Sequence, residues 1–168
     1  IIFLSIGFFL LFLSISTFPM ADSYHWEMPK YWVQNGTIAP YPTLNFRHTS
    51  LSFLRETAIL SNYFWIGFPA ISVIHEWLAY ILLYFVISNF GERIGFSKKA
   101  SLFGAFIVSS FSIVLQTAFA GTNDLLAAFF QFTAFWYLTT LNRDEDENTR
   151  KKTLMLSILS FCIAMGIK

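Results

Sequence analysis

The stretch ISVIHEWLAYILLYFVISNF, residues 71–90, decides the class of fold. A helix of about 20 predominantly apolar residues is needed to cross the hydrocarbon core of a bilayer, and this stretch has that length. His75 and Glu76 near its start are adjacent, so on a helix they point in directions about 100° apart. We interpret them as a polar patch that faces the interior of a helix bundle or its outer vestibule. The stretch therefore predicts a membrane-spanning helix.

Four further apolar stretches predict spans beside it: residues 1–18, 101–120, 125–141 and 153–168. The first exceeds the roughly 7–15 residues of a signal-peptide core and has no basic segment before it, which favours an anchor helix. Only 12% of all residues are charged, whereas soluble domains carry about 25%. The sequence thus predicts an all-α protein, a polytopic membrane helix bundle of about five spans.

The chain begins and ends inside apolar runs, so we expect residues 1–168 to be the N-terminal part of one longer transmembrane domain. The single cysteine, Cys162, excludes an internal disulfide and a cysteine-cluster metal site. The net charge of +1 gives no argument for nucleic-acid binding. We expect membrane lipids as the surroundings and no nucleic-acid partner.

Basic residues predict the orientation, because they gather in the connections 91–100 and 142–152: Arg93, Lys98, Lys99, Arg143, Arg150, Lys151 and Lys152. Successive spans alternate in direction, so both connections lie on one side, and their Lys and Arg content makes that side cytoplasmic. The outer side then holds the loop 19–70 and the turn AGTND at 120–124. We expect a multi-pass protein of a bacterial plasma membrane with its site on the outer face.

Residues 27–35 have the pattern of an amphipathic helix. Its polar arc holds Glu27, Lys30 and Gln34, and its apolar side holds Met28, Pro29, Trp32 and Val33. Because Pro29 is tolerated only in a first turn, the helix starts at or just after His25, and Gly36 suits its C-terminal end. We expect it to lie flat in the membrane interface. Residues 51–68 predict a second interfacial or re-entrant helix.

Two carboxylates are predicted at the outer boundary of the bilayer. Asp22 follows the helix-breaking Pro19 by three residues, and Asp124 precedes the fourth span. Carboxylates near hydrocarbon are costly and usually mark functional sites. The alternative is helix capping, by Asp22 for the segment after it and by Asp124, Asn123 or Thr122 for the fourth span.

Arg47 and His48 follow the proline-stiffened stretch APYPT, residues 39–43. A guanidinium held at the interface suits the phosphate group of a lipid. The alternative for Arg47 is an ordinary headgroup-anchoring role. His25 fits an interfacial hydrogen-bonding residue better than a base or a metal ligand.

The series D-S-x5-P-K-x-W-x-Q-N-G-x4-Y-P-T over residues 22–43, followed by Arg47 and Glu56, resembles the first outer loop of bacterial glycosyltransferases of the C-type (GT-C) fold. These are relatives of the protein O-mannosyltransferases and of lipid-linked-sugar transferases. TNDLLAAF at 122–129 resembles their turn between the third and fourth spans. Many relatives carry Tyr-His before Leu-Pro-Arg, whereas this chain has Trp26-Glu27 before Met28-Pro29-Lys30, so Glu27 replaces a histidine and Lys30 an arginine.

The resemblance implies transfer of a sugar from a polyprenyl-phosphate donor to an acceptor hydroxyl of a protein, lipid or glycan, with inversion at the anomeric carbon. It implies that Asp22 is the base and that Asp124 is a second acid, which holds a divalent metal ion or orients the acceptor. The substrate-binding residues that it implies are Glu27, Lys30, Arg47, His48 and Asn123.

Two other classes of function remain open from the sequence. One is a transporter or channel in which Asp22, Glu76 and Asp124 line a path, although transporter sites usually lie at the midplane among broken helices. The other is a non-catalytic scaffold of a membrane complex, which would not explain the ordered series from Asp22 to Arg47.

Overall fold

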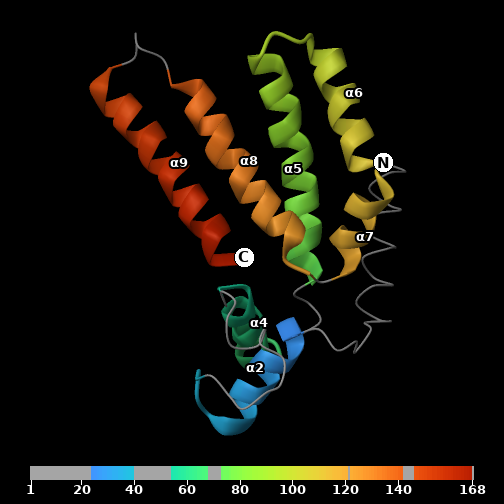
Figure 1. Ribbon diagram of the computed structural model, residues 1–168, viewed down its shortest axis with the longest axis vertical. Coiled ribbons are helices and arrows are strands. Elements are labelled where there is room, and N and C mark those ends of the chain that lie inside the picture. The colour runs from blue at the N-terminus through green and yellow to red at the C-terminus, as the bar shows by residue number, and fades with distance from the viewer. Residues whose placement is uncertain (1–23, 40–53, 68–72, 121, 142–145, 168) are drawn as a thin grey trace.

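The computed structural model describes residues 24–39, 54–67, 73–120, 122–141 and 146–167 (Figure 1). Within these ranges the chain forms helices and no strands, which confirms an all-α protein. The helices are α2 (Tyr24–Asn35), α4 (Leu54–Trp65), α5 (Val73–Arg93), α6 (Lys98–Ser109), α7 (Ser112–Ala120), α8 (Asp124–Thr140) and α9 (Glu147–Ile167). The predicted span at 1–18 lies outside the described residues.

α5 is the centre of an antiparallel bundle. It packs against α6 and α7 on one side and α8 on the other, and α9 packs on the outer side of α8 (Figure 1). Ala79, Tyr80 and Leu83 of α5 form its buried core with Ala118 of α7 and Leu125 of α8.

The described helices match the predicted spans to different degrees. α5 closely matches the prediction at 71–90, and among the described helices it alone is by itself long and apolar enough to cross a membrane. α8 has 17 residues, and α9 has basic residues in its first two turns. The number of five spans therefore stays a prediction.

The predicted span at 101–120 is bent in the structure, because α6 and α7 meet at an angle of 68°. The break falls at Ser110, whose hydroxyl donates to the carbonyl oxygen of Phe106 at 2.7 Å. The backbone N–H of Phe111 then bonds to the carbonyl of Val108, three residues back. Serine back-bonding of this kind bends helices. Together α6 and α7 have the length and composition of a broken span or a re-entrant loop.

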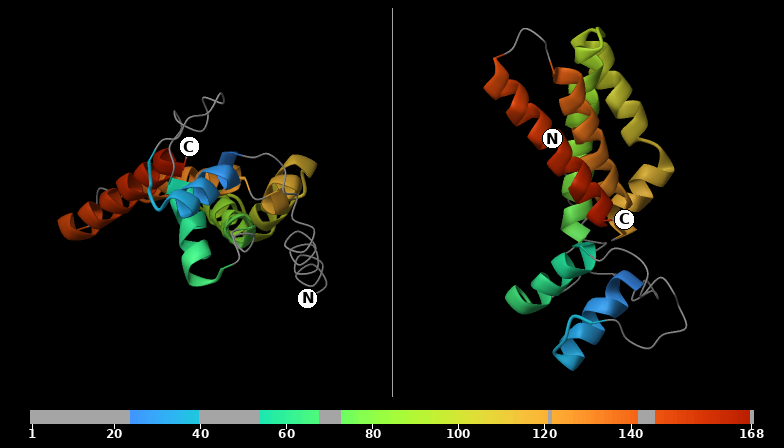
Figure 2. Two further views of the ribbon diagram at one scale, coloured as in Figure 1. Left: turned by 90° about the horizontal axis from the view of Figure 1, so that it is seen from below. Right: turned by 60° about the vertical axis from the view of Figure 1, so that its left-hand side comes forward.

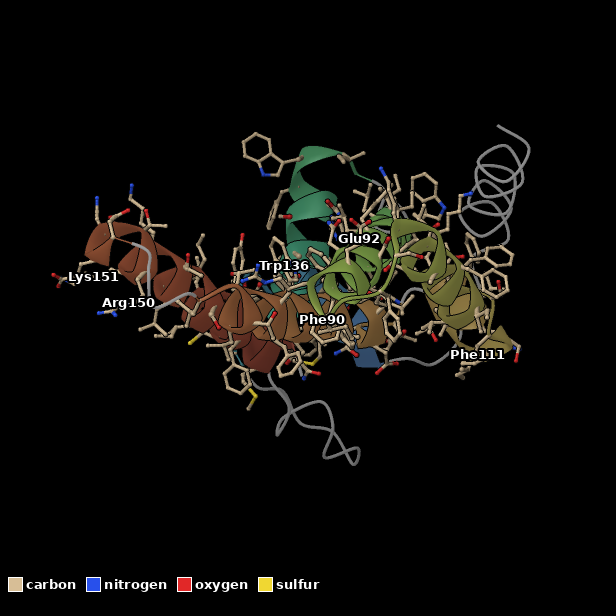
Figure 3. All side chains as sticks on the ribbon, turned by 90° about the horizontal axis from the view of Figure 1, so that it is seen from above. Phe90, Glu92, Phe111, Trp136, Arg150 and Lys151 are labelled. Atoms are coloured by element: carbon tan, nitrogen blue, oxygen red, sulfur yellow. The ribbon has the colours of Figure 1, made fainter. Side chains whose placement is uncertain are left out.

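The two basic connections lie at one end of the bundle, as helix alternation predicts. The Nε of Arg93, at the end of α5, donates to the carbonyl oxygen of Thr139 near the end of α8 at 3.3 Å. Arg150 and Lys151 in the first turns of α9 lie at the same end, which is the end nearest the viewer in Figure 3. The starts of α5 and α8 and the end of α9 therefore lie at the opposite end.

α2 and α4 lie beyond this opposite end, and they pack on each other (Figure 2). Met28 and Trp32 of α2 are buried against Leu60 of α4. The indole N–H of Trp32 donates to the carbonyl oxygen of Ala39 at 3.1 Å, which ties the chain after α2 back onto the helix. Gly36 ends α2 with a φ of +64°, a conformation that favours glycine, as predicted.

The prediction that α2 lies flat in the membrane interface stays a prediction, but the structure gives the apolar face of α2 a partner within the protein. Its polar arc is confirmed, since Glu27, Lys30 and Gln34 are exposed. Its apolar face instead packs on α4, except that Val33 is 41% exposed. The reason is that two amphipathic helices can bury their apolar faces against each other, which requires no lipid.

Candidate functional site

The sequence-predicted site residues divide into two groups. Asp22, Arg47 and His48 lie outside the described residues, so their predicted roles stay predictions. Glu27 and Lys30 are exposed on α2, while Asn123 and Asp124 stand where α8 begins. α2 and the start of α8 lie at the same end of the molecule (Figure 1).

Asn123 joins α8 to α9. It occupies the N-cap position of α8, but its side chain makes no capping hydrogen bond there. Its amide nitrogen Nδ2 instead donates to the carbonyl oxygen of Ile167, at the end of α9, at 2.7 Å. Only 3% of Asn123 is exposed, so this bond is made away from bulk water, where leaving either group unpaired would cost about 1–3 kcal/mol.

Glu76 joins α5 to α8. Its carboxylate oxygen Oε2 accepts a hydrogen bond from the backbone N–H of Leu126, in the first turn of α8, at 3.2 Å. Glu76 is 0% exposed. The positive end of the helix dipole and the unsatisfied N–H groups of a first turn both favour a carboxylate at this place. This agrees with the prediction of a polar group that faces the bundle interior, and it adds the contact to α8.

Asp124 is the first residue of α8, and its side chain is exposed. It follows Asn123 and precedes Leu126 by two residues, so the bonds to α9 and to α5 lie on either side of it. The arrangement brings an exposed carboxylate to the end of the bundle where α2 and α4 lie, on a helix start held from two directions.

Glu56 is a further buried acid that the sequence interpretation left without a role. It lies in the first turn of α4 and is 0% exposed. The sequence drew attention to Glu56 only through the resemblance to GT-C glycosyltransferases, in which it is the last residue of the matching series. The periodicity of the sequence did not predict the burial of Glu56, which stands beside Arg55 at the front of an apolar stretch.

An apolar groove of about 280 Å³ lies between α4, α8 and α9. Its lining residues are Leu54, Thr57, Ala58, Leu126, Phe130, Ile163 and Ile167. Leu126 and Ile167 are also the residues whose backbone groups bond to Glu76 and Asn123. The polar contacts at the start of α8 and the apolar groove are therefore adjacent.

Asp124 is the predicted metal ligand. Among the described residues, no group of three or more His, Cys, Asp or Glu side chains could hold a metal ion. Mg²⁺ is often held by one or two carboxylates together with substrate phosphates and waters. An exposed carboxylate such as that of Asp124 suits this second kind of site, with the remaining ligands supplied by substrate.

No protein family, curated protein or solved structure matches this chain.

Proposed function

We propose that this chain belongs to a membrane glycosyltransferase, which moves a sugar from a polyprenyl-phosphate donor to an acceptor hydroxyl at the outer membrane interface. The observation that carries the proposal is the position of the acids. Glu76 and Asp124 lie at the end of the bundle opposite Arg93 and Lys151, next to an apolar groove. A lipid-linked sugar needs such a neighbourhood, because its tail stays in hydrocarbon while its phosphate and sugar stay in water.

The roles of the residues follow from the chemistry of the transfer. The acceptor hydroxyl attacks the anomeric carbon, its proton passes to a base, and the bond from that carbon to the phosphate oxygen breaks. Asp22 is the proposed base. Lys30 and Arg47 are proposed to neutralise the departing polyprenyl phosphate, while Asp124 holds a divalent cation or orients the acceptor.

The proposed membrane arrangement has five spans. α5, the bent α6–α7 pair, α8 and α9 cross the bilayer, and residues 1–18 supply one more. The end with Arg93, Lys98 and Lys151 faces the cytoplasm of a bacterium. Many large apolar side chains on α6 and α9 are exposed, among them Phe103, Phe106, Met155 and Phe161, and a lipid environment would cover them.

The position of Glu76 favours the transferase over a transporter. Glu76 lies in the first turn of α5, at the end of the bundle. A transporter that used Glu76 and Asp124 to line a path would be expected to hold its substrate near the midplane of the membrane.

The test is sugar transfer by the natural full-length protein in liposomes, with a radiolabelled polyprenyl-phosphate sugar. Asp22→Asn is expected to abolish transfer while the protein still accumulates in the membrane. Glu92→Gln is the matched control, because Glu92 is an exposed acid at the end of α5 near the basic connection. Equal activity of the Asp22→Asn protein and the unmodified protein would remove Asp22 from the mechanism.

A further inference from the structure

We propose that Glu76 is a positioning residue that fixes the first turn of α8 and thereby the carboxyl group of Asp124. The inference rests on the proposed function, because it assigns to Asp124 a position that sugar transfer needs. It goes beyond that function by naming a residue of α5 that touches no substrate and acts through α8.

α8 begins without a capping hydrogen bond from the side chain at its N-cap position. The first four backbone N–H groups of a helix have no acceptor inside the helix, and the N-cap side chain usually accepts one of them. In α8 the side chain at the N-cap, Asn123, is directed to α9. The N–H of Leu126 is accepted instead by Glu76, which lies 50 residues earlier in the chain.

The two hydrogen bonds hold the chain on opposite sides of Asp124. Asn123 ties the residue before Asp124 to the last turn of α9, and Glu76 ties the residue two places after it to the first turn of α5. Both side chains are buried, so water does not readily replace either bond. The backbone at Asp124 is held by two other helices, although its own side chain is exposed.

The side chain of Glu76 suits this contact, because it is long enough to reach α8 from α5 and its oxygen accepts a backbone N–H. A rigid start of α8 is what an acid near a reacting sugar requires, since misplacement by about 1 Å can lower a rate about 100-fold.

The experiment compares Glu76→Gln with Glu76→Leu in the natural full-length protein. Glutamine keeps an oxygen that accepts the N–H of Leu126, whereas leucine has a similar size and no acceptor. We expect Glu76→Leu to lower kcat about 100-fold with little change in KM for the donor, and Glu76→Gln to stay within about tenfold of the unmodified protein. Glu76→Thr, whose hydroxyl is too short to reach, replaces the leucine variant where that variant does not accumulate.

Ser157→Ala is the matched structural control. Ser157 is buried, and its hydroxyl donates to the carbonyl oxygen of Ala134 at 2.9 Å, joining α8 to α9 away from Asp124. We expect this variant to lose stability and to keep its kcat. An equal loss of kcat in Ser157→Ala and Glu76→Leu would overturn the inference, because it would show that any broken contact between helices has the same effect.

Amide hydrogen exchange at Leu126 separates this inference from the proposed function. Loss of the acceptor in Glu76→Leu is expected to speed exchange there about tenfold or more, whereas Glu76→Gln and Ser157→Ala leave it nearly unchanged. An unmodified protein that transfers no sugar would end the proposed function, and the exchange rates would still decide whether Glu76 holds the start of α8. Unchanged exchange at Leu126 in Glu76→Leu would overturn the inference in either case.

Discussion

Asp146 shows at the scale of one residue how this chain starts a helix with its own side chain. Its Oδ1 accepts the backbone N–H groups of Asn148 and Thr149 at 2.9 and 3.0 Å, and its Oδ2 accepts the hydroxyl of Thr149 at 2.6 Å. The hydroxyl of Thr149, and then its backbone N–H, lower the pKa of Asp146 from the ordinary value of 3.8. α9 is thus capped locally, whereas α8 takes an acceptor from another helix.

Asp146→Ala is expected to loosen the first turn of α9. Because the pKa of Asp146 is lower in the folded protein, its stabilisation is complete above the ordinary value of 3.8 and is lost as the pH falls through the folded value. Amide exchange at Asn148 and Thr149 should be about fivefold faster in the variant near neutral pH, and the difference should narrow well below pH 3.8, because the protonated carboxyl is a weaker acceptor.

Asp146→Asn is the control, since its amide oxygen still accepts but does not titrate. The asparagine variant should keep slow exchange and lose the acid-dependent change. Persistence of that change in Asp146→Asn would assign it to another group.

The contact between α5 and α6 shows at the scale of elements why two helices can approach closely. A Cβ atom added at Gly91 of α5 would meet the Oγ of Ser101 at 2.8 Å and its Cβ at 3.0 Å. Gly104 lies one turn after Ser101 in α6, and a Cβ atom added there would meet no atom within 4 Å. Phe90, beside Gly91, packs instead on Phe132 and Phe135 of α8. Gly91 therefore sets the distance between α5 and α6, and Phe90 sets the distance between α5 and α8.

Gly91→Ala is expected to destabilise the bundle by about 1–3 kcal/mol, because the new methyl group overpacks the contact with Ser101. Gly104→Ala is the matched variant and should stabilise α6 by about 0.5–1 kcal/mol, since alanine favours a helix and meets no atom there. Thermal unfolding in detergent measures both. The double variant Gly91→Ala/Ser101→Gly should recover most of the loss, and a failure to recover would place the strain elsewhere.

At the scale of the whole molecule, polar groups are sorted between the two ends of the bundle. Arg93, Lys98 and Lys151 lie at one end, and α2, α4 and the start of α8 lie at the other (Figure 1). This separation follows from the antiparallel order of the helices, because each successive helix returns the chain to the other end of the bundle. It is the geometry that the proposed membrane orientation requires.

Cysteine labelling tests that orientation. In a Cys162→Ser background, Thr37→Cys should react with a membrane-impermeant maleimide on intact cells. Lys98→Cys and Lys151→Cys should react only after the cells are permeabilised, because the basic end is predicted to be cytoplasmic. All three positions are exposed in the structure, so a lack of reaction reports the membrane side. Labelling of Lys98→Cys and Lys151→Cys from opposite sides would contradict the proposed spans.

The sequence by itself determined the all-helical class, α5, the end of α2 at Gly36 and the sorting of polar ends. These features depend on local pattern: an apolar run of sufficient length, a glycine where the backbone needs a positive φ, and helices that alternate in direction. Only the tertiary structure decided that α2 buries Met28 and Trp32 on α4, that α6 and α7 bend apart, and that Glu76 receives the N–H of Leu126. Those features depend on contacts between distant segments, which no local period encodes, because each apolar face or buried acid can be satisfied by several partners until packing selects one.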